Sequence, residues 1–267
     1  MDRSTSDQER KLVRLGRDAV LQGLPLPTNE PPWIGAALLM LQKLRAPSSP
    51  SGASDAATIA LDLLEATMAR RTTRQVIECT RGCSFCCHSV VSTTAPEIFR
   101  LARWLQQNAS ARPSHLTIDM ILQRADHRKE LTLDNLMQQR PECVLLLNGA
   151  CTAYQVRPGN CRRLLSLSKA ACKADFEGVP SRIPVVEEAM QKGTHVRALM
   201  LAAVAAAKLP TTSYELSQAL ALVLREPDTE RRWLNGEDVF SPLQIAHDPG
   251  PLQSTINHWL ARLQRFI

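Results

Sequence analysis

Aromatic residues and glycine are scarce in this chain of 267 residues. Phe, Trp and Tyr together make up 4% of the sequence, which contains 11 glycines. Sandwiches and barrels are built from many short strands rich in aromatic residues, joined by glycine-containing turns. The composition therefore argues against an all-β fold and favours a mainly α-helical protein.

The sequence also has no long hydrophobic run. Its longest apolar stretches, WIGAALLML from residue 33 and ALMLAAVAAAKL from residue 198, fall short of the roughly 20 residues that span a bilayer. The first 20 residues alternate charges and contain no apolar segment typical of a secretory signal. We therefore expect no membrane segment and a cytoplasmic location.

Acidic residues are fewer than basic ones, and the net charge is +6. Such a charge can indicate nucleic-acid binding, but the basic residues are scattered and no stacking aromatics lie among them. The positive charge could instead offset the negative charge of cysteine thiolates, because a site of four thiolates on one divalent ion has a net charge of about −2. The sequence does not favour nucleic acid as a partner.

Apolar residues recur at helical spacing along most of the chain. Asn148-Gly149, between two short apolar runs, predicts a hairpin turn, and Pro158 predicts a helical turn around Cys161. The fold prediction is mainly α, with one short β-hairpin inside a cysteine-rich metal-binding region. Helices are predicted over residues 7–22, 31–45, 95–107, 115–130, 181–207, 211–225, 227–234 and 251–265, with an amphipathic segment over 54–78.

The low-complexity stretch APSSPSGAS, residues 46–54, is predicted to be a linker. It divides the chain into three predicted parts. These are an N-terminal helical segment with the linker (1–54), a cysteine-cluster metal-binding domain (55–178) and a C-terminal helical region (179–267).

The eight cysteines are confined to one part of the chain, in the patterns Cys79-x3-Cys83-x2-Cys86-Cys87 and Cys143-x7-Cys151-x9-Cys161-x10-Cys172. In a reducing compartment such a set indicates metal ligands rather than disulfides. The C-x2-C pair is the usual chelating unit. Adjacent cysteines point apart in extended chain, which favours two metals or one multinuclear site.

All eight cysteines are therefore predicted metal ligands: Cys79, Cys83, Cys86, Cys87, Cys143, Cys151, Cys161 and Cys172. Arg81, Arg157 and Arg162 are predicted to bind the cofactor by offsetting the charge of the thiolates. His88 is expected to be a polar neighbour of the cysteines rather than a ligand. Glu97 is expected to stabilise its helix from the first turn.

The cofactor is predicted to be an iron-sulfur cluster or zinc. Spacings of 7, 9 and 10 residues do not resemble paired zinc knuckles, so they favour iron. The C-x3-C-x2-C spacing is also that of radical S-adenosylmethionine enzymes. This chain lacks their repeated strand-helix alternation, which argues against that alternative.

Two blocks of sequence carry a family resemblance. GCSFCCH with TTAPEIFRLARWL, and CVLLLNGACTAYQVRPGNCRRLLSLSKAAC, together resemble the YkgJ-type cysteine-cluster proteins, a family described as zinc- or iron-chelating. The chain departs from the family at Val144, where proline is common, and at Asn148, where acidic residues are common. The matching positions are Cys79, Cys83, Cys86, Cys87, Glu97, Cys143, Gly149, Cys151, Tyr154, Arg157, Pro158, Cys161, Arg162 and Cys172.

The resemblance implies a metal-binding protein. A flagellin lysine methylase carries a similar cysteine cluster of iron-sulfur type, so a cluster-dependent oxidoreductase or protein-modifying enzyme is an alternative. A structural zinc adaptor, whose N-terminal helices bind a protein partner, is another. The sequence leaves these alternatives, the number of metal sites and the substrate open.

Overall fold

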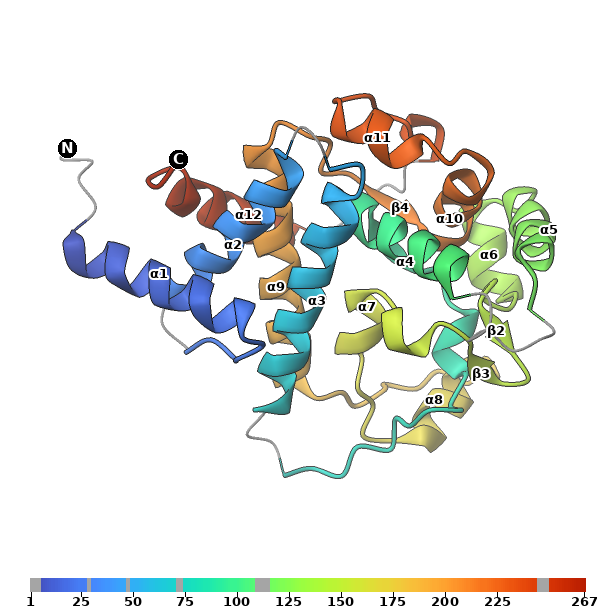
Figure 1. Cartoon of the computed structure of the whole chain (residues 1–267). Helices are drawn as coiled ribbons and strands as arrows, with labels where there is room; N and C mark the ends of the chain where they lie inside the picture. Colours follow the sequence, from blue (N-terminus) through green and yellow to red (C-terminus); the bar gives the residue numbers. More distant parts are fainter. Residues whose placement is uncertain (1–5, 28–29, 47–48, 71–73, 109–115, 244–249) are drawn as a thin grey trace.

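Helices dominate residues 6–27, 30–46, 49–70, 74–108, 116–243 and 250–267, which are the residues that the computed structural model describes (Figure 1). The predicted mainly α fold is confirmed. The helices are α1 (Asp7–Leu21), α2 (Pro31–Leu44), α3 (Gly52–Ala69), α4 (Ala95–Gln107), α5 (Ile118–Lys129), α6 (Leu133–Gln139), α7 (Gly159–Arg163), α8 (Lys169–Phe176), α9 (Glu187–Ala206), α10 (Leu216–Arg225), α11 (Thr229–Leu234) and α12 (Gly250–Leu263).

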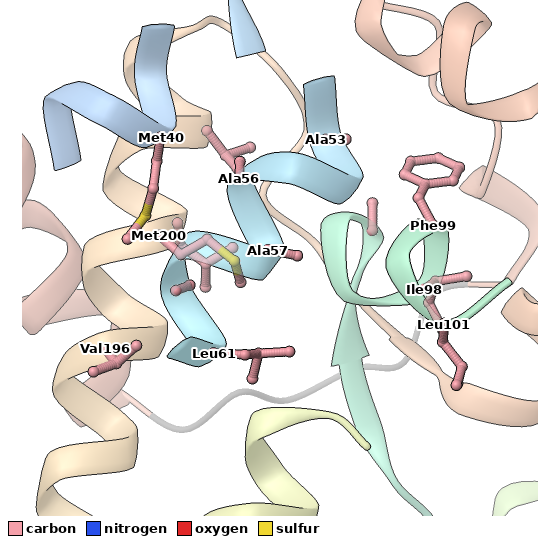
Figure 2. Close-up of a cluster of buried hydrophobic side chains, with 14 of the residues drawn as sticks. Met40, Ala53, Ala56, Ala57, Leu61, Ile98, Phe99, Leu101, Val196 and Met200 are labelled. Atoms are coloured by element: carbon pink, nitrogen blue, oxygen red, sulfur yellow. The ribbon is translucent and has the colours of Figure 1, made fainter. Parts of the chain in front are cut away.

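Helix α3 lies at the centre of the core, where it packs against α2, α4 and α9. Figure 2 shows its alanines and Leu61 between Met200 of α9 on one side and Phe99 of α4 on the other. Ala198, Ala202 and Ala203 are also among the buried residues of α9. These small side chains let the helix axes approach closely, because nothing beyond Cβ separates the backbones.

Helices α1 and α2 cross at a pair of glycines. A Cβ on Gly16 would lie 2.1 Å from the Pro32 carbonyl oxygen, and one on Gly35 would lie 2.3 Å from the Val13 carbonyl oxygen. Each glycine therefore admits the backbone of the other helix, and neither position has room for a side chain.

We expect Gly35→Ala to separate α1 from α2, because the new methyl group meets backbone that cannot move aside. The expected loss is about 1–3 kcal/mol of the free energy of unfolding, together with faster tryptic cleavage at Arg14 and Arg17. Chemical denaturation and limited proteolysis measure both effects. Leu15→Ala, at an exposed position of α1, is the control, and equal stability of the two variants would contradict the interpretation.

Two small antiparallel ribbons complete the fold within the described ranges. The predicted hairpin is present: β2 (Leu146–Leu147) pairs with β3 (Ala150–Cys151). The second ribbon, which the sequence analysis missed, pairs β1 (Ser92–Thr94) with β4 (Ser213–Glu215). Each of its strands runs directly into a helix, α4 or α10, so three extended residues were too few to interrupt the helical pattern.

Five predicted boundaries were wrong. The helix predicted over 211–225 begins only at Leu216, after β4, and the one predicted over 181–207 begins at Glu187. The amphipathic segment predicted over 54–78 is helical only to Ala69. The last three residues of the linker predicted over 46–54 belong to α3. The helix predicted from residue 115 begins at Ile118, while residue 115 lies outside the described residues.

One cluster of buried hydrophobic residues extends from Val13 in α1 to Leu263 in α12. This cluster contains residues from all three predicted parts of the chain, which were divided near residues 54 and 178. The division into three parts stays a prediction. Among the described residues, no helix combines the length and apolar character needed to cross a bilayer.

Candidate metal centre

The cysteines lie on short and irregular elements at one side of the helical core. Figure 1 shows the chain from residue 74 running below α7 and past α8 before it rises into β1. Cys79 and Cys83 belong to this irregular stretch, and Cys86 and Cys87 to the short 3-10 helix η1 (Phe85–His88) that follows. All eight cysteines fall within the described ranges and are free thiols.

The second cysteine segment supplies one thiol from each of four local structures. Cys143 precedes β2, while Cys151 belongs to β3 and pairs with Leu146. Cys161 lies in α7, whose N-cap is Pro158 as predicted, and Cys172 lies in α8. The hairpin turn places Asn148 and Gly149 at φ 51° and 73°, the left-handed conformation that these two residue types favour.

Backbone hydrogen bonds hold the two segments together. The Cys143 amide donates to the Cys87 carbonyl oxygen at 2.7 Å, and the Glu78 amide donates to the Ser166 carbonyl oxygen at 3.1 Å. Nδ1 of His88 lies 3.0 Å from the Arg140 carbonyl oxygen. The structure therefore brings together cysteines that are more than fifty residues apart in sequence.

Four cysteines form an outer set around one small cavity of about 80 Å³. They are Cys79, Cys83, Cys86 and Cys172. The ring of Phe176 in α8 contacts Phe85 and His88, with centroid distances of 5.8 and 4.7 Å, and so fixes η1 against α8. Burial raises the pKa of the Cys79 and Cys83 thiols above their usual value.

We group the other four cysteines, Cys87, Cys143, Cys151 and Cys161, as an inner set, because Cys143 and Cys151 each raise the pKa of both Cys87 and Cys161. Burial raises the pKa of Cys143 to about 12, raises that of Cys151, and raises that of Cys161 well above the usual value. The charges of these thiolates would also repel one another, since Cys143 and Cys151 each contribute to the raised pKa of Cys161. All four thiols are therefore protonated at neutral pH in the metal-free protein.

Cys86 and Cys87 join the two sets through a thiol-thiol hydrogen bond. The Cys87 thiol donates, which lowers the pKa of Cys86 to about 7 and raises that of Cys87. Arg157 also lowers the pKa of Cys86. Cys86 is thus the thiol of this region that ionises most readily, because its neighbours stabilise the thiolate.

Arg157 is the cation placed among the thiols. It lowers the pKa of Cys79, Cys151 and Cys161 as well as that of Cys86. Its guanidinium carbon lies 3.9 Å from the ring centroid of Tyr154, which Arg81 approaches from 6.0 Å. The buried Nε of Arg157 has no hydrogen-bond partner within the described part of the chain, so this charge is available to thiolates.

Arg162 occupies a different position. Its guanidinium donates to the carbonyl oxygens of Gln155 and Arg157 and forms an ion pair with Glu65 of α3. Arg162 therefore holds the loop that carries Arg157, and its direct contact with a cofactor stays a prediction.

Glu97 lies beneath the second cysteine segment. Its buried carboxylate accepts hydrogen bonds from the Thr94 amide and hydroxyl in a capping box at the start of α4. It also accepts one from the Gly159 amide at 2.7 Å, two residues before Cys161. The predicted role in stabilising its own helix is confirmed, and the contact with α7 adds to it.

Sequence reasoning identified Cys172 of α8 but missed Lys169 and Asp175 of the same helix. Lys169 lines the outer cavity and lowers the pKa of Cys83, and Asp175 lines the same cavity. Lys169 and Cys172 are three residues apart, a spacing that puts them on the same face of a helix. This spacing is the sequence feature that could have identified Lys169 as a neighbour of the thiols.

The donor set matches the chemistry of zinc and iron, since all eight donors are thiols gathered in one region. Within residues that the structure describes, no three Cys, His, Asp or Glu side chains stand in ready metal-ligand geometry. Comparison of the chain with protein-family models, curated proteins and solved structures found no match. The resemblance to YkgJ-type proteins stays a prediction.

Proposed function

We propose that this protein is a cytoplasmic metal-binding protein that holds iron, as an iron-sulfur cluster, or zinc through cysteine thiolates. The observation that carries the proposal is the meeting of two cysteine segments, joined by the hydrogen bond between Cys143 and Cys87. Reduced thiols crowded in a protein interior repel one another once ionised, and a bound cation removes that cost. The family resemblance leads to the same proposal.

The two sets of thiols support two adjoining centres. Each set contains four cysteines, the number that closes a tetrahedral zinc site or ligates a four-iron cluster. Cys86 belongs to the outer set and Cys87 to the inner set, so adjacent cysteines serve different centres. Arg157 is positioned to offset negative charge on both.

The small size of the outer cavity favours metal binding over catalysis on an organic substrate. Its volume of about 80 Å³ is far below the roughly 300–1,000 Å³ typical of sites for organic ligands. The cavity has room for an ion or a few atoms of a cluster. We therefore place the cluster-dependent enzyme second. The structural zinc adaptor also binds metal through these cysteines, and there the metal serves only to hold the fold together.

Anaerobic purification followed by analysis of iron, acid-labile sulfide and zinc tests the proposal. A brown protein with iron and sulfide in equal amounts supports an iron-sulfur cluster. A colourless protein with about two zinc ions per chain supports zinc in both sets. A protein that takes up neither metal, natively or after anaerobic reconstitution, with eight titratable thiols, overturns the proposal.

Metal binding is expected to release protons, because ligand thiols must ionise. Burial raises the pKa of Cys143, Cys151 and Cys161, so at pH 7 an ion in the inner set displaces about four protons. The affinity of the inner set for zinc therefore rises with pH and falls on acidification. Zinc titration of the metal-free protein in buffers of different ionisation enthalpy measures the release. Fewer than two protons for each ion would contradict the assignment of the inner set.

A further inference from the structure

A cavity with a volume of about 480 Å³ is lined by none of the cysteines. Its walls come from the chain between α1 and α2, from α2, from the end of α3, and from α9 and α12. This volume lies within the range of roughly 300–1,000 Å³ in which proteins bind small organic molecules.

One wall of the cavity is aromatic. Trp33 of α2 and Trp259 of α12 are stacked, with ring centroids 6.3 Å apart and an angle of 25° between their planes. Nε1 of Trp33 donates to the Pro27 carbonyl oxygen at 2.8 Å, which fixes that ring and the chain segment containing Leu26. A rigid wall of indole and proline rings favours a flat apolar group.

The acidic groups of the cavity already have partners. Glu188 lies 2.6 Å from Nζ of Lys192, one helical turn away on α9. Glu30 lies 3.0 Å from Nε2 of His258. The Glu30 carboxylate also lies 3.5 Å from Nε of Arg262. Because Lys192 and Arg262 offset the charges of the two carboxylates, neither is left to attract a cationic ligand.

Two donors of the cavity, in contrast, are not engaged. Arg70 and His195 line it and are exposed. Neither side chain forms a hydrogen bond or an ion pair with a residue that the structure describes, and the His195 ring lies edge-on to the Trp259 ring, with centroids 6.5 Å apart. Arg70 carries a permanent charge, and its planar guanidinium can hold a carboxylate through two parallel hydrogen bonds. The uncompensated charge of the cavity is therefore positive.

We propose that this cavity binds a small aromatic carboxylate. The aromatic ring packs on the wall formed by Trp33 and Trp259, and the carboxylate faces Arg70 and His195. This site is separate from the cysteine centre and does not depend on a bound metal.

Titration of the purified full-length protein with 2-naphthoate, followed by calorimetry and tryptophan fluorescence, tests the proposal. We expect saturable binding of one molecule per chain. Arg70→Ala should weaken it about tenfold, since a charge-assisted hydrogen bond contributes at least that factor. The neutral analogue 2-naphthalenemethanol should bind more weakly, and equally well to the parent and to Arg70→Ala.

Arg14→Ala is the matched control, because Arg14 is an exposed arginine of α1 outside the cavity. It should bind 2-naphthoate as the parent does. Three results would overturn the proposal: no saturable binding, equal affinity of Arg70→Ala and Arg14→Ala, or equal binding of 2-naphthoate and its neutral analogue. Measurement with metal-free protein should give the same affinities.

Discussion

Serine at position 161 is expected to abolish metal binding by the inner set, whereas serine at position 83 should abolish binding by the outer set only. In a zinc protein either change would reduce two ions per chain to about one. Both variants should also lower the melting temperature, because each set joins thiols of the two cysteine segments. Structural zinc contributes on the order of 10 kcal/mol to the folding of small zinc domains, so the shift should be large.

The physical reason is that the stretch from residue 74 to residue 84 belongs to no helix or strand and is exposed or half-buried throughout. Its hydrogen bonds to the second segment include one from the Glu78 amide and a weak one from the Cys79 thiol to the Leu164 carbonyl oxygen at 3.8 Å. Metal analysis and thermal unfolding of each variant check the result. Val76→Ala, at an exposed position of the same stretch and outside the cavity, is the control. Unchanged stoichiometry and melting in both cysteine variants would remove these residues from the ligand set.

The structural elements around the cysteines were largely predictable because they depend on local chemistry. Asn148-Gly149 supplies two residues that adopt positive φ, and Pro158 supplies a helix start, so each turn follows from its own residues. Helix α4 was predictable for the same reason, since Thr94 and Glu97 form its capping box.

The division of the cysteines into sets was not predictable, because it depends on contacts between distant segments. Cys172 joins Cys79, Cys83 and Cys86 across about ninety residues. The packing of Phe176 against η1 brings them together. Sequence spacing would have grouped Cys172 with Cys161, since spacing carries no information on how α8 folds back.

The arginines illustrate the same limit. Arg157 and Arg162 both follow the hairpin and looked equivalent as partners of the thiolates. Their roles separate only where α3 supplies Glu65 to Arg162. Arg157, without a carboxylate partner in the described structure, is the one that affects the thiol pKa values.

Alanine at position 97 is expected to cost about 3–5 kcal/mol of the free energy of unfolding, the usual cost of removing one member of a buried charged network. Glu97 is 3% exposed. Its carboxylate lies 3.9 Å from the guanidinium of Arg197 and accepts hydrogen bonds from Thr94 and Gly159. Removing it leaves buried donors of β1 and α7 without their acceptor. Glu97→Gln should recover part of the loss, because the amide oxygen still accepts.

The same variant should weaken zinc binding by the inner set about 10- to 100-fold, the range found when residues that orient metal ligands are replaced. The link is the Gly159 amide, which Glu97 holds at the start of the turn that carries Cys161. Thr117→Ala removes a helix cap of α5 and is the matched control. It should cost about 1 kcal/mol and leave zinc affinity unchanged. If Glu97→Ala kept the affinity of Thr117→Ala, Glu97 would stabilise the fold without positioning Cys161, because a merely structural loss lowers stability and spares the metal.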